Sequence, residues 1–194
     1  MSSQPPQPPD PNRSPTGHVF WLFGLSGAGK STLAGRLSAH LRNRSGDGLL
    51  LLDGDRIRNG LSAGLGFSEA DRTENLRRAA EVARLGVESG LLVVAAFITP
   101  LEEQRRRIRG IVGAKAVSFV WVNAALGTCR DRDAKGLYAR AAAGITRDVT
   151  GVSAAFENPV FPDLELATDR EEVEVSAARL TRFADLTLGA IGRV

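Results

Sequence analysis

A short stretch near the start of the chain, GLSGAGKST from Gly24 to Thr32, has the residue types and spacing of a loop that binds nucleotide phosphates. Its glycines let the backbone approach the phosphates, and Gly27 and Gly29 can adopt positive φ. Lys30 would reach the β- and γ-phosphate oxygens, and the Ser31 hydroxyl would ligate Mg²⁺. The spacing predicts ATP-dependent phosphoryl transfer, with ATP bound by Gly24, Leu25, Ser26, Gly27, Ala28, Gly29, Lys30, Ser31 and Thr32.

Two carboxylates, Asp53 and Asp55, follow the apolar run Leu49 to Leu52. A carboxylate at the end of such a run could organise Mg²⁺ or accept the proton of an attacking hydroxyl. Asp53 could instead cap the helix that follows. We therefore assign Asp55, with Lys30, to catalysis, and Asp55, with Ser31, to the metal.

Ser68 and Asp71 form a helix-capping pattern at the start of a predicted helix over Glu69 to Ser89. Its buried face is predicted to carry Leu76, Ala80, Ala83 and Val87, which recur at helical spacing. Extended back by one turn, that face includes Arg72 and Asn75. Polar groups on an inward face meet something polar or anionic, so these two, with nearby Arg58 and Phe67, predict a ligand pocket.

The strand predicted over Leu91 to Ala96 leads into Phe97, Ile98, Thr99 and Pro100, without the acidic residues of motor ATPases and GTPases. That absence favours a small-molecule kinase. The run Thr99-Pro100-Leu101-Glu102 has the pattern of a helix start with proline at the first helical position. Thr99 is therefore expected to cap a helix over Leu101 to Ile111.

These residues need a scaffold in which apolar strands alternate with helices. Such an alternation predicts a three-layer α/β/α fold with a mainly parallel central sheet and ligands at the strand ends. The expected strands are Val19 to Phe23, Leu49 to Leu52, Leu91 to Ala96 and Ala116 to Val122. The expected helices are Ser31 to Arg44, Glu69 to Ser89, Leu101 to Ile111, part of Ala124 to Ala143, and Val173 to Leu186.

Length and composition narrow the function classes. The 194 residues fit one domain over 17–194, preceded by a proline-rich tail over 1–16 that is expected to be disordered. A net charge of +3 without a basic stripe argues against nucleic acid. The longest apolar run is too short to span a membrane, and no secretory signal precedes it. The single cysteine, Cys129, suits a reducing compartment, so we expect a cytoplasmic protein.

Five segments together carry a family resemblance: GLSGAGKST, LDGDRIRNGL, LGFSEADRTENLRRAAEVARL, AFITP and RDAKGLY. The chain resembles adenosine 5′-phosphosulfate (APS) kinases from about residue 19 to residue 166. The resemblance implies that the 3′-hydroxyl of APS attacks the γ-phosphate of ATP, giving 3′-phosphoadenosine 5′-phosphosulfate (PAPS) and ADP with Mg²⁺. It also implies a possible homodimer, since the family often forms one, and a possible functional link to ATP sulfurylase.

The resemblance assigns roles to particular residues. Arg132 is assigned to ATP binding, and the region from Arg132 to Gly144 resembles a mobile lid over the site. The implied APS-binding residues are Asp55, Arg58, Phe67, Arg72, Asn75, Ile98, Thr99, Lys135 and Leu137.

Departures from the family pattern leave two alternatives open. Thr99 stands where serine is common, Ala134 replaces a lid proline, and Phe156 replaces a tyrosine. A related kinase that uses another nucleotide or a metabolite hydroxyl would accommodate such changes. A non-catalytic nucleotide-binding module is the other alternative, and retention of Lys30, Ser31 and Asp55 argues against it.

Overall fold

The sheet is built from the apolar runs of the chain. In the computed structural model, which describes residues 17–45, 48–133, 136–146 and 149–192, five strands pair in the order β2-β3-β1-β4-β5, and every neighbouring pair is parallel. Central strands of this kind are apolar at most positions because helices cover both faces, and every residue of β1 is buried. The strands are β1 (His18–Phe23), β2 (Leu49–Asp53), β3 (Leu92–Phe97), β4 (Val117–Asn123) and β5 (Leu164–Ala167).

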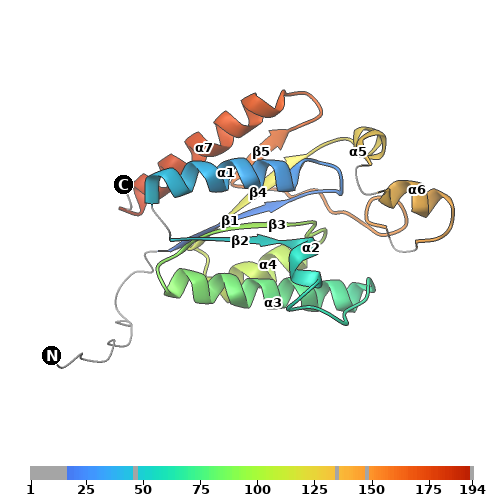
Figure 1. The fold of residues 1–194 in the computed structure, drawn as a ribbon, viewed down its shortest axis with the longest axis horizontal. Helices are drawn as coiled ribbons and strands as arrows, with labels where there is room; N and C mark the ends of the chain where they lie inside the picture. The colour runs from blue at the N-terminus through green and yellow to red at the C-terminus, as the bar shows by residue number, and fades with distance from the viewer. Residues whose placement is uncertain (1–16, 46–47, 134–135, 147–148, 193–194) are drawn as a thin grey trace.

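The helices form two outer layers, which confirms the predicted three-layer α/β/α fold (Figure 1). Helices α1 (Lys30–Ser45) and α7 (Val173–Ala190) pack together on one face of the sheet. Helices α3 (Glu69–Glu88) and α4 (Glu102–Val112) pack together on the other. Three short helices lie at the end of the sheet where the strands finish: α2 (Gly54–Arg58), α5 (Leu126–Arg132) and α6 (Leu137–Ala142).

Each face of the sheet has its own apolar core. Under α1 and α7, Phe20 and Leu22 of β1 pack with Leu37 and Leu180. Under α3 and α4, Trp21 stacks on Phe97 at a ring-centroid distance of 5.0 Å. Alternate residues of β1 therefore enter opposite cores, which holds the phosphate loop after β1 in a rigid frame.

Predicted and observed bounds of the main elements agree within one residue at most ends, although α7 continues to Ala190. Two elements were not predicted. Helix α2 is too short to show a periodicity, and β5 is an edge strand whose four residues include the exposed Glu165. The tail predicted over residues 1–16 lies outside the described residues.

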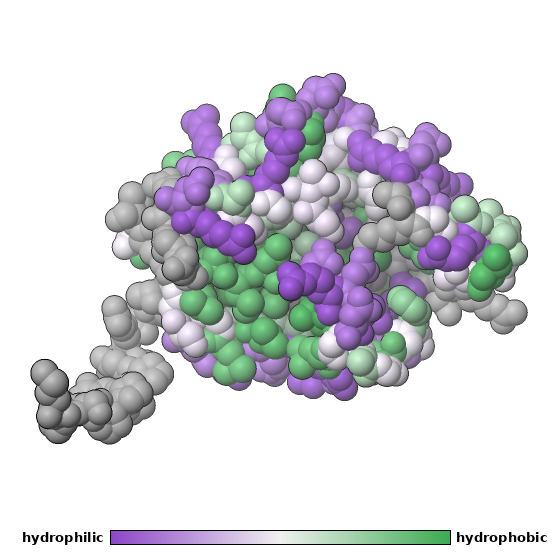
Figure 2. Space-filling view, viewed as in Figure 1, coloured by the Kyte–Doolittle hydropathy of each residue, from purple (hydrophilic) through white to green (hydrophobic). Residues whose placement is uncertain are grey.

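The edge strand β2 leaves an apolar surface between α1 and α3. Figure 2 shows hydrophobic side chains gathered on this face. Leu49, Leu50 and Leu51 of β2 are only half-buried, and Leu85 of α3 is 53% exposed. None of the helices in the described part of the chain has the length and hydropathy to cross a membrane.

Candidate active site

The loop between β1 and α1 requires glycine at specific positions. Gly27 and Gly29 have φ of 79° and 98°, in the region that glycine adopts without strain. A Cβ on Gly24 would lie 2.2 Å from the Val122 carbonyl oxygen, and one on Gly27 would lie 2.7 Å from the Cys129 carbonyl oxygen. The loop backbone therefore packs directly against β4 and α5, and these contacts define its conformation before any nucleotide binds.

Lys30 begins α1 and folds back over the loop. Its Nζ donates a 2.6 Å hydrogen bond to the Leu25 carbonyl oxygen. The ammonium group is thus held beside the loop amides and the N-terminus of α1, all of which attract anions. This arrangement suits the β- and γ-phosphates of a nucleotide.

Asp53 takes part in two hydrogen bonds at the end of β2. Its Oδ2 accepts from the Ser31 hydroxyl at 2.9 Å. Its Oδ1 accepts from the Asp55 backbone N–H at 3.0 Å, so Asp53 is the N-cap of α2, as one of our alternatives predicted. Asp55 itself is exposed in the first turn of α2 and lines the cavity described below.

Arg58 and Phe67 lie together between α2 and α3. The Arg58 guanidinium carbon is 4.6 Å from the centroid of the Phe67 ring, and Arg58 Nη1 donates to the Gly66 carbonyl oxygen. Burial lowers the pKa of Arg58, and the positive charge of Arg72 acts in the same direction. The Phe67 ring is 61% exposed, which leaves an aromatic surface open to a ligand.

Arg72 and Asn75 both face the cavity from the start of α3. Arg72 Nε donates to the Phe67 carbonyl oxygen at 2.8 Å, and its Nη1 donates to Thr150 Oγ1 at 2.6 Å. Asn75 is 3% exposed, and its Oδ1 has no hydrogen-bond partner among the described groups. A buried amide oxygen without a partner is costly, so a ligand donor is the natural group to satisfy it.

Thr99 does not cap a helix, and that prediction was wrong. Helix α4 begins at Glu102, and Leu101 occupies the N-cap position. Thr99 is buried with φ of 44°, and its hydroxyl accepts a 2.9 Å hydrogen bond from Trp21 Nε1. The hydrogen bond from Trp21, on the neighbouring strand β1, therefore holds the Thr99 hydroxyl away from the helix-capping role that the local sequence predicted.

Arg105 of α4 holds the turn around Thr99. Its guanidinium is 4% exposed and donates to the carbonyl oxygens of Thr99, Pro100 and Glu157. Its Nε donates to Glu102 Oε2 at 2.8 Å. A non-glycine residue at positive φ carries strain, and these bonds stabilise the turn in that conformation.

The lid region contacts the phosphate loop. Arg132 at the end of α5 donates to the carbonyl oxygens of Gly27 and Thr168. The hydroxyl of Tyr138 in α6 donates to the Ser26 carbonyl oxygen at 3.0 Å, and burial raises the pKa of Tyr138 to about 12. Leu137 lines the cavity, whereas Lys135 lies outside the described residues.

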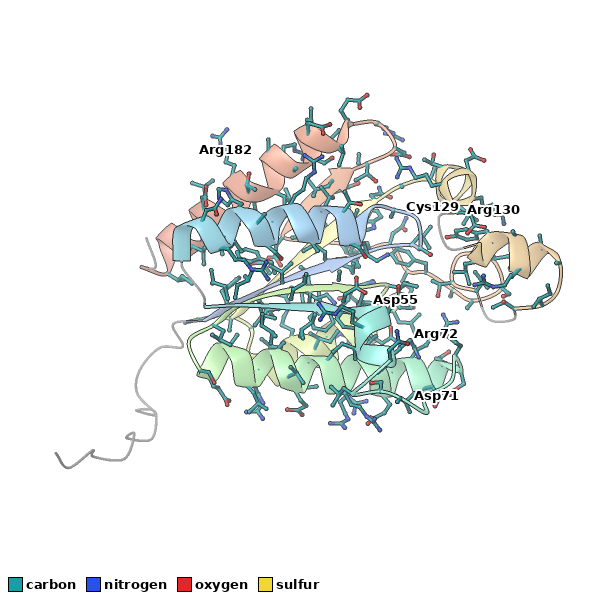
Figure 3. The ribbon with its side chains drawn as sticks, in the orientation of Figure 1. Asp55, Asp71, Arg72, Cys129, Arg130 and Arg182 are labelled. Carbon is teal, nitrogen blue, oxygen red and sulfur yellow. The ribbon has the colours of Figure 1, made fainter. Side chains whose placement is uncertain are left out.

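A single cavity of about 1230 Å³ joins the phosphate loop to the acceptor-side residues. Figure 3 shows Asp55 and Arg72 at the same end of the domain as α5 and α6. Gly24 and Leu25 support the loop from outside the cavity lining. The predicted site residues that line it are Ser26, Gly27, Ala28, Gly29, Lys30, Ser31, Thr32, Asp55, Arg58, Phe67, Arg72, Asn75, Ile98, Thr99, Arg132 and Leu137.

Two threonines of the cavity were missed in the sequence. Thr150 accepts from Arg72, and the Thr168 hydroxyl donates to the Ala28 carbonyl oxygen at 2.8 Å. Thr168 follows β5, so recognition of that strand would have drawn attention to it, since ligands bind where parallel strands end. No sequence signal marks Thr150, because its partner lies 78 residues away.

Comparisons with known proteins point to one family. The family model described as adenylylsulphate kinase matches residues 16–167. The adenylyl-sulfate kinase of Paraburkholderia xenovorans is 51% identical over 175 residues, which are 90% of this chain and 96% of that protein. The corresponding enzyme of Geotalea uraniireducens is 44% identical over 91% of this chain and 84% of its own.

A solved structure shows the same fold. The APS kinase CysC of Mycobacterium tuberculosis, in complex with AMPPNP and APS, superposes with a TM-score of 0.81. It is 39% identical over 89% of this chain and 99% of that chain. The chain belongs to the adenylylsulphate kinase family.

Proposed function

We propose that this protein transfers the γ-phosphoryl group of ATP to the 3′-hydroxyl of APS, with PAPS and ADP as products. The observation that carries the proposal is that one cavity is lined both by the phosphate loop and by two arginines, an aromatic ring and a buried amide. The Mycobacterium tuberculosis relative was solved with AMPPNP and APS, which supports this pair of substrates.

The phosphate loop would bind the triphosphate. Backbone N–H groups of the loop between Ser26 and Thr32 and the N-terminus of α1 supply donors that need no rearrangement, apart from the Ala28 N–H, which donates to the Leu25 carbonyl oxygen. Lys30 places a cation beside them, held by the Leu25 carbonyl oxygen. Charge that develops on the transferred group is thereby stabilised in a preorganised site.

The acceptor-side residues would hold APS by complementary chemistry. The exposed Phe67 ring offers a stacking surface for adenine, and Arg58 and Arg72 place two positive charges beside it. Planar guanidinium groups match the forked oxygens of phosphate and sulfate. Asn75 supplies its unpaired Oδ1, and Ile98, Thr99, Lys135 and Leu137 complete the proposed APS set.

Asp55 is the proposed general base. It would accept the proton of the 3′-hydroxyl as that oxygen forms a bond to the γ-phosphorus, while the bond from the γ-phosphorus to the β-phosphate oxygen breaks and ADP leaves. The in-line geometry depends on Asp55 and the loop sharing one cavity. The wall contributed by Thr99 and Pro100 would limit how far the acceptor can move.

Magnesium fits the donors at the loop. The Ser31 hydroxyl and the Asp53 carboxylate are 2.9 Å apart, and both are hard oxygen ligands of the kind Mg²⁺ prefers. We propose Ser31 and Asp55 as the metal set, with Asp53 beside them as a further oxygen donor. A bound Mg²⁺ would neutralise phosphate charge and orient the β- and γ-oxygens.

A coupled assay for ADP release tests the proposal. Purified protein is incubated with Mg²⁺ and ATP, with and without APS, and the product is identified by chromatography. ADP release that depends on APS, with an equal amount of PAPS, is expected. ATP binding without turnover of APS would overturn the assigned acceptor and direct a screen to other nucleotides and metabolite hydroxyls.

We also propose a cellular location for the enzyme and a second enzyme that supplies its substrate. The use of ATP and the presence of a single cysteine, Cys129, support a cytoplasmic location. An adenylyl transfer to sulfate, the reaction of ATP sulfurylase, would supply APS. The bifunctional enzyme NodQ of Azospirillum brasilense contains a segment 45% identical to this chain, over 26% of its length, which supports a link between this domain and a second activity.

Self-association is a further proposal for this chain. A hexameric APS kinase from Thiobacillus denitrificans has the same fold, with a TM-score of 0.66, although this chain covers only 30% of that one. Within the described part of the chain, no strand pairs with the outer edge of β2, which carries the half-buried leucines. Two such edges can pair antiparallel across a two-fold axis. We therefore propose a homodimer formed along β2.

A further inference from the structure

Thr150 has a buried hydroxyl on the wall of the cavity, in the turn that follows the lid region. Its exposed fraction is 4%. The turn is closed by hydrogen bonds from Val149 N to Ser153 Oγ and from Gly151 N to the Ala154 carbonyl oxygen. Thr150 is therefore part of a firmly closed turn, and its hydroxyl has a defined position relative to the cavity.

That hydroxyl contacts a proposed APS-binding arginine. Arg72 Nη1 donates to Thr150 Oγ1 at 2.6 Å, and Arg72 Nε donates to the Phe67 carbonyl oxygen at 2.8 Å. The guanidinium is planar, so two bonds from different nitrogens to different segments fix its plane. The Phe67 bond comes from the residue just before the N-cap of α3, whereas the Thr150 bond comes from a turn 78 residues further along the chain.

The chemical nature of the group that accepts the Arg72 hydrogen bond matters because the site must bind an anion. Arg58 and Arg72 are close enough for the charge of one to affect the other. A carboxylate at position 150 would orient Arg72 but would also cancel its charge. A hydroxyl orients the guanidinium and contributes no opposing charge, so the arginine stays available to a phosphate or sulfate group.

We propose that Thr150 is a positioning residue for the kinase reaction, one that sets the plane of the Arg72 guanidinium for the anionic end of APS. The proposal rests on the proposed function of this cavity. It extends the acceptor site to the 149–154 turn, which neither the phosphate loop nor the predicted APS-binding residues include.

Kinetic analysis of two substitutions tests the proposal. Thr150→Val keeps the shape and branching of the side chain but removes the hydroxyl, whereas Thr150→Ser keeps the hydroxyl. We expect Thr150→Val to raise KM for APS by roughly 10-fold or more, the effect of one hydrogen bond to a charged group. KM for ATP and kcat at saturating APS should change by less than about 2-fold, and Thr150→Ser should restore KM for APS.

Thr168→Val is the matched control, because it removes another cavity hydroxyl with a different partner. Thr168 donates to the Ala28 carbonyl oxygen in the phosphate loop. Its substitution should raise KM for ATP more than KM for APS. An unchanged KM for APS in Thr150→Val, or an equal rise for both substrates in that variant, would overturn the positioning role.

A second measurement does not need turnover of APS. Slow rotation about the Nε–Cζ bond of Arg72 would give separate ¹⁵N resonances for its two Nη groups, to be assigned by their loss in Arg72→Lys. We expect separate resonances in the ligand-free wild type and in Thr150→Ser, and a merged resonance in Thr150→Val. Identical spectra in all three proteins would overturn the proposal, whereas a wild type inactive with APS would overturn only the proposed function.

Discussion

At the scale of single residues, the site depends on groups whose positions are set before ligands bind. Lys30 is held by Leu25, Arg72 by Phe67 and Thr150, and Asp53 by Ser31 and the first turn of α2. Preorganised charges need no reorganisation during the reaction, which is the main source of electrostatic catalysis. Loss of one such group should therefore affect the rate far more than it affects the fold.

Lys30→Ala is expected to lower kcat by about 100-fold to 1,000-fold, the range found when one preorganised donor is removed from a charged transition state. The γ-phosphoryl group loses its nearest cation, while the loop keeps its glycines. The ADP-release assay measures the effect. Lys115→Ala, which changes an exposed lysine, is the control and should match the wild type. Near-normal activity of Lys30→Ala would refute the role assigned to the loop.

His18 should make stability depend on pH. Burial lowers its pKa from 6.5 to about 4, its Nε2 lies 2.9 Å from Ser118 Oγ, and its buried Nδ1 has no hydrogen-bond partner among the described residues. The neutral form is favoured in the folded state, so the stabilisation is complete above pH 6.5 and is lost as the pH falls towards 4. At pH 5.5 the loss should be about 1.4 kcal/mol relative to neutral pH.

Urea unfolding of the wild type and of His18→Gln at pH 7.5 and pH 5.5 measures this contribution. The difference in unfolding free energy between the two pH values should shrink in His18→Gln, because glutamine does not titrate. An identical pH dependence in both proteins would show that other groups account for it.

At the scale of elements, α4 supports the cavity wall through one buried side chain. Arg105 connects α4 to the Thr99–Pro100 turn after β3 and to the backbone at Glu157, and its guanidinium lies 5.1 Å from the Phe23 ring. Three segments distant in sequence therefore meet at one charged group. Such buried, fully bonded charges are costly to disrupt, because the partners left behind lose their hydrogen bonds.

Arg105→Met is expected to lower the free energy of unfolding by about 2–4 kcal/mol, since three carbonyl oxygens each lose a hydrogen bond. Denaturant unfolding measures the change. Arg106→Met alters the neighbouring, exposed arginine and should stay within about 0.5 kcal/mol of the wild type. Equal stability of Arg105→Met and Arg106→Met would mean that the turn does not depend on Arg105.

Across the domain as a whole, the carboxyl ends of the strands and the lateral edge of the sheet at β2 have different roles. The strand ends carry the cavity and the short helices, whereas α1 and α3 flank the apolar edge of β2 (Figure 2). An exposed apolar edge strand favours association with another chain. The catalytic cavity and the proposed dimer surface thus occupy separate parts of the domain.

Leu85→Glu is expected to shift the protein from dimer to monomer, because a charge next to the β2 edge opposes burial of that surface. Light scattering coupled to size-exclusion chromatography measures the mass. Leu186→Glu is the matched control, since Leu186 is 66% exposed on α7, which packs against β5 at the other end of the sheet order. A monomeric wild type, or dimers in both variants, would contradict the proposed interface.

Much of the fold and part of the site could be predicted from the sequence, because their signals are local. The phosphate loop is contiguous, and its glycines are required by close backbone approaches at Gly24 and Gly27. The long helices and the four predicted strands showed clear periodicities or apolar runs. The capping role of Ser68 and the buried positions Leu76, Ala80, Ala83 and Val87 were also predicted and are confirmed.

The remaining features of the fold and the site depend on contacts between segments that are distant in the sequence. Thr99 has the local pattern of a helix cap, yet Trp21 and Arg105 place it in a buried turn at positive φ. The strand β5 is too short to be recognised alone and is defined by its pairing with β4. The residues that could bind phosphate are recognisable from the amino-acid sequence, because adjacent residues carry that chemistry. The contacts of Thr150 with Arg72 and of Thr168 with the phosphate loop are visible only in the folded chain, because the partner of a hydroxyl depends on which distant segment packs against it.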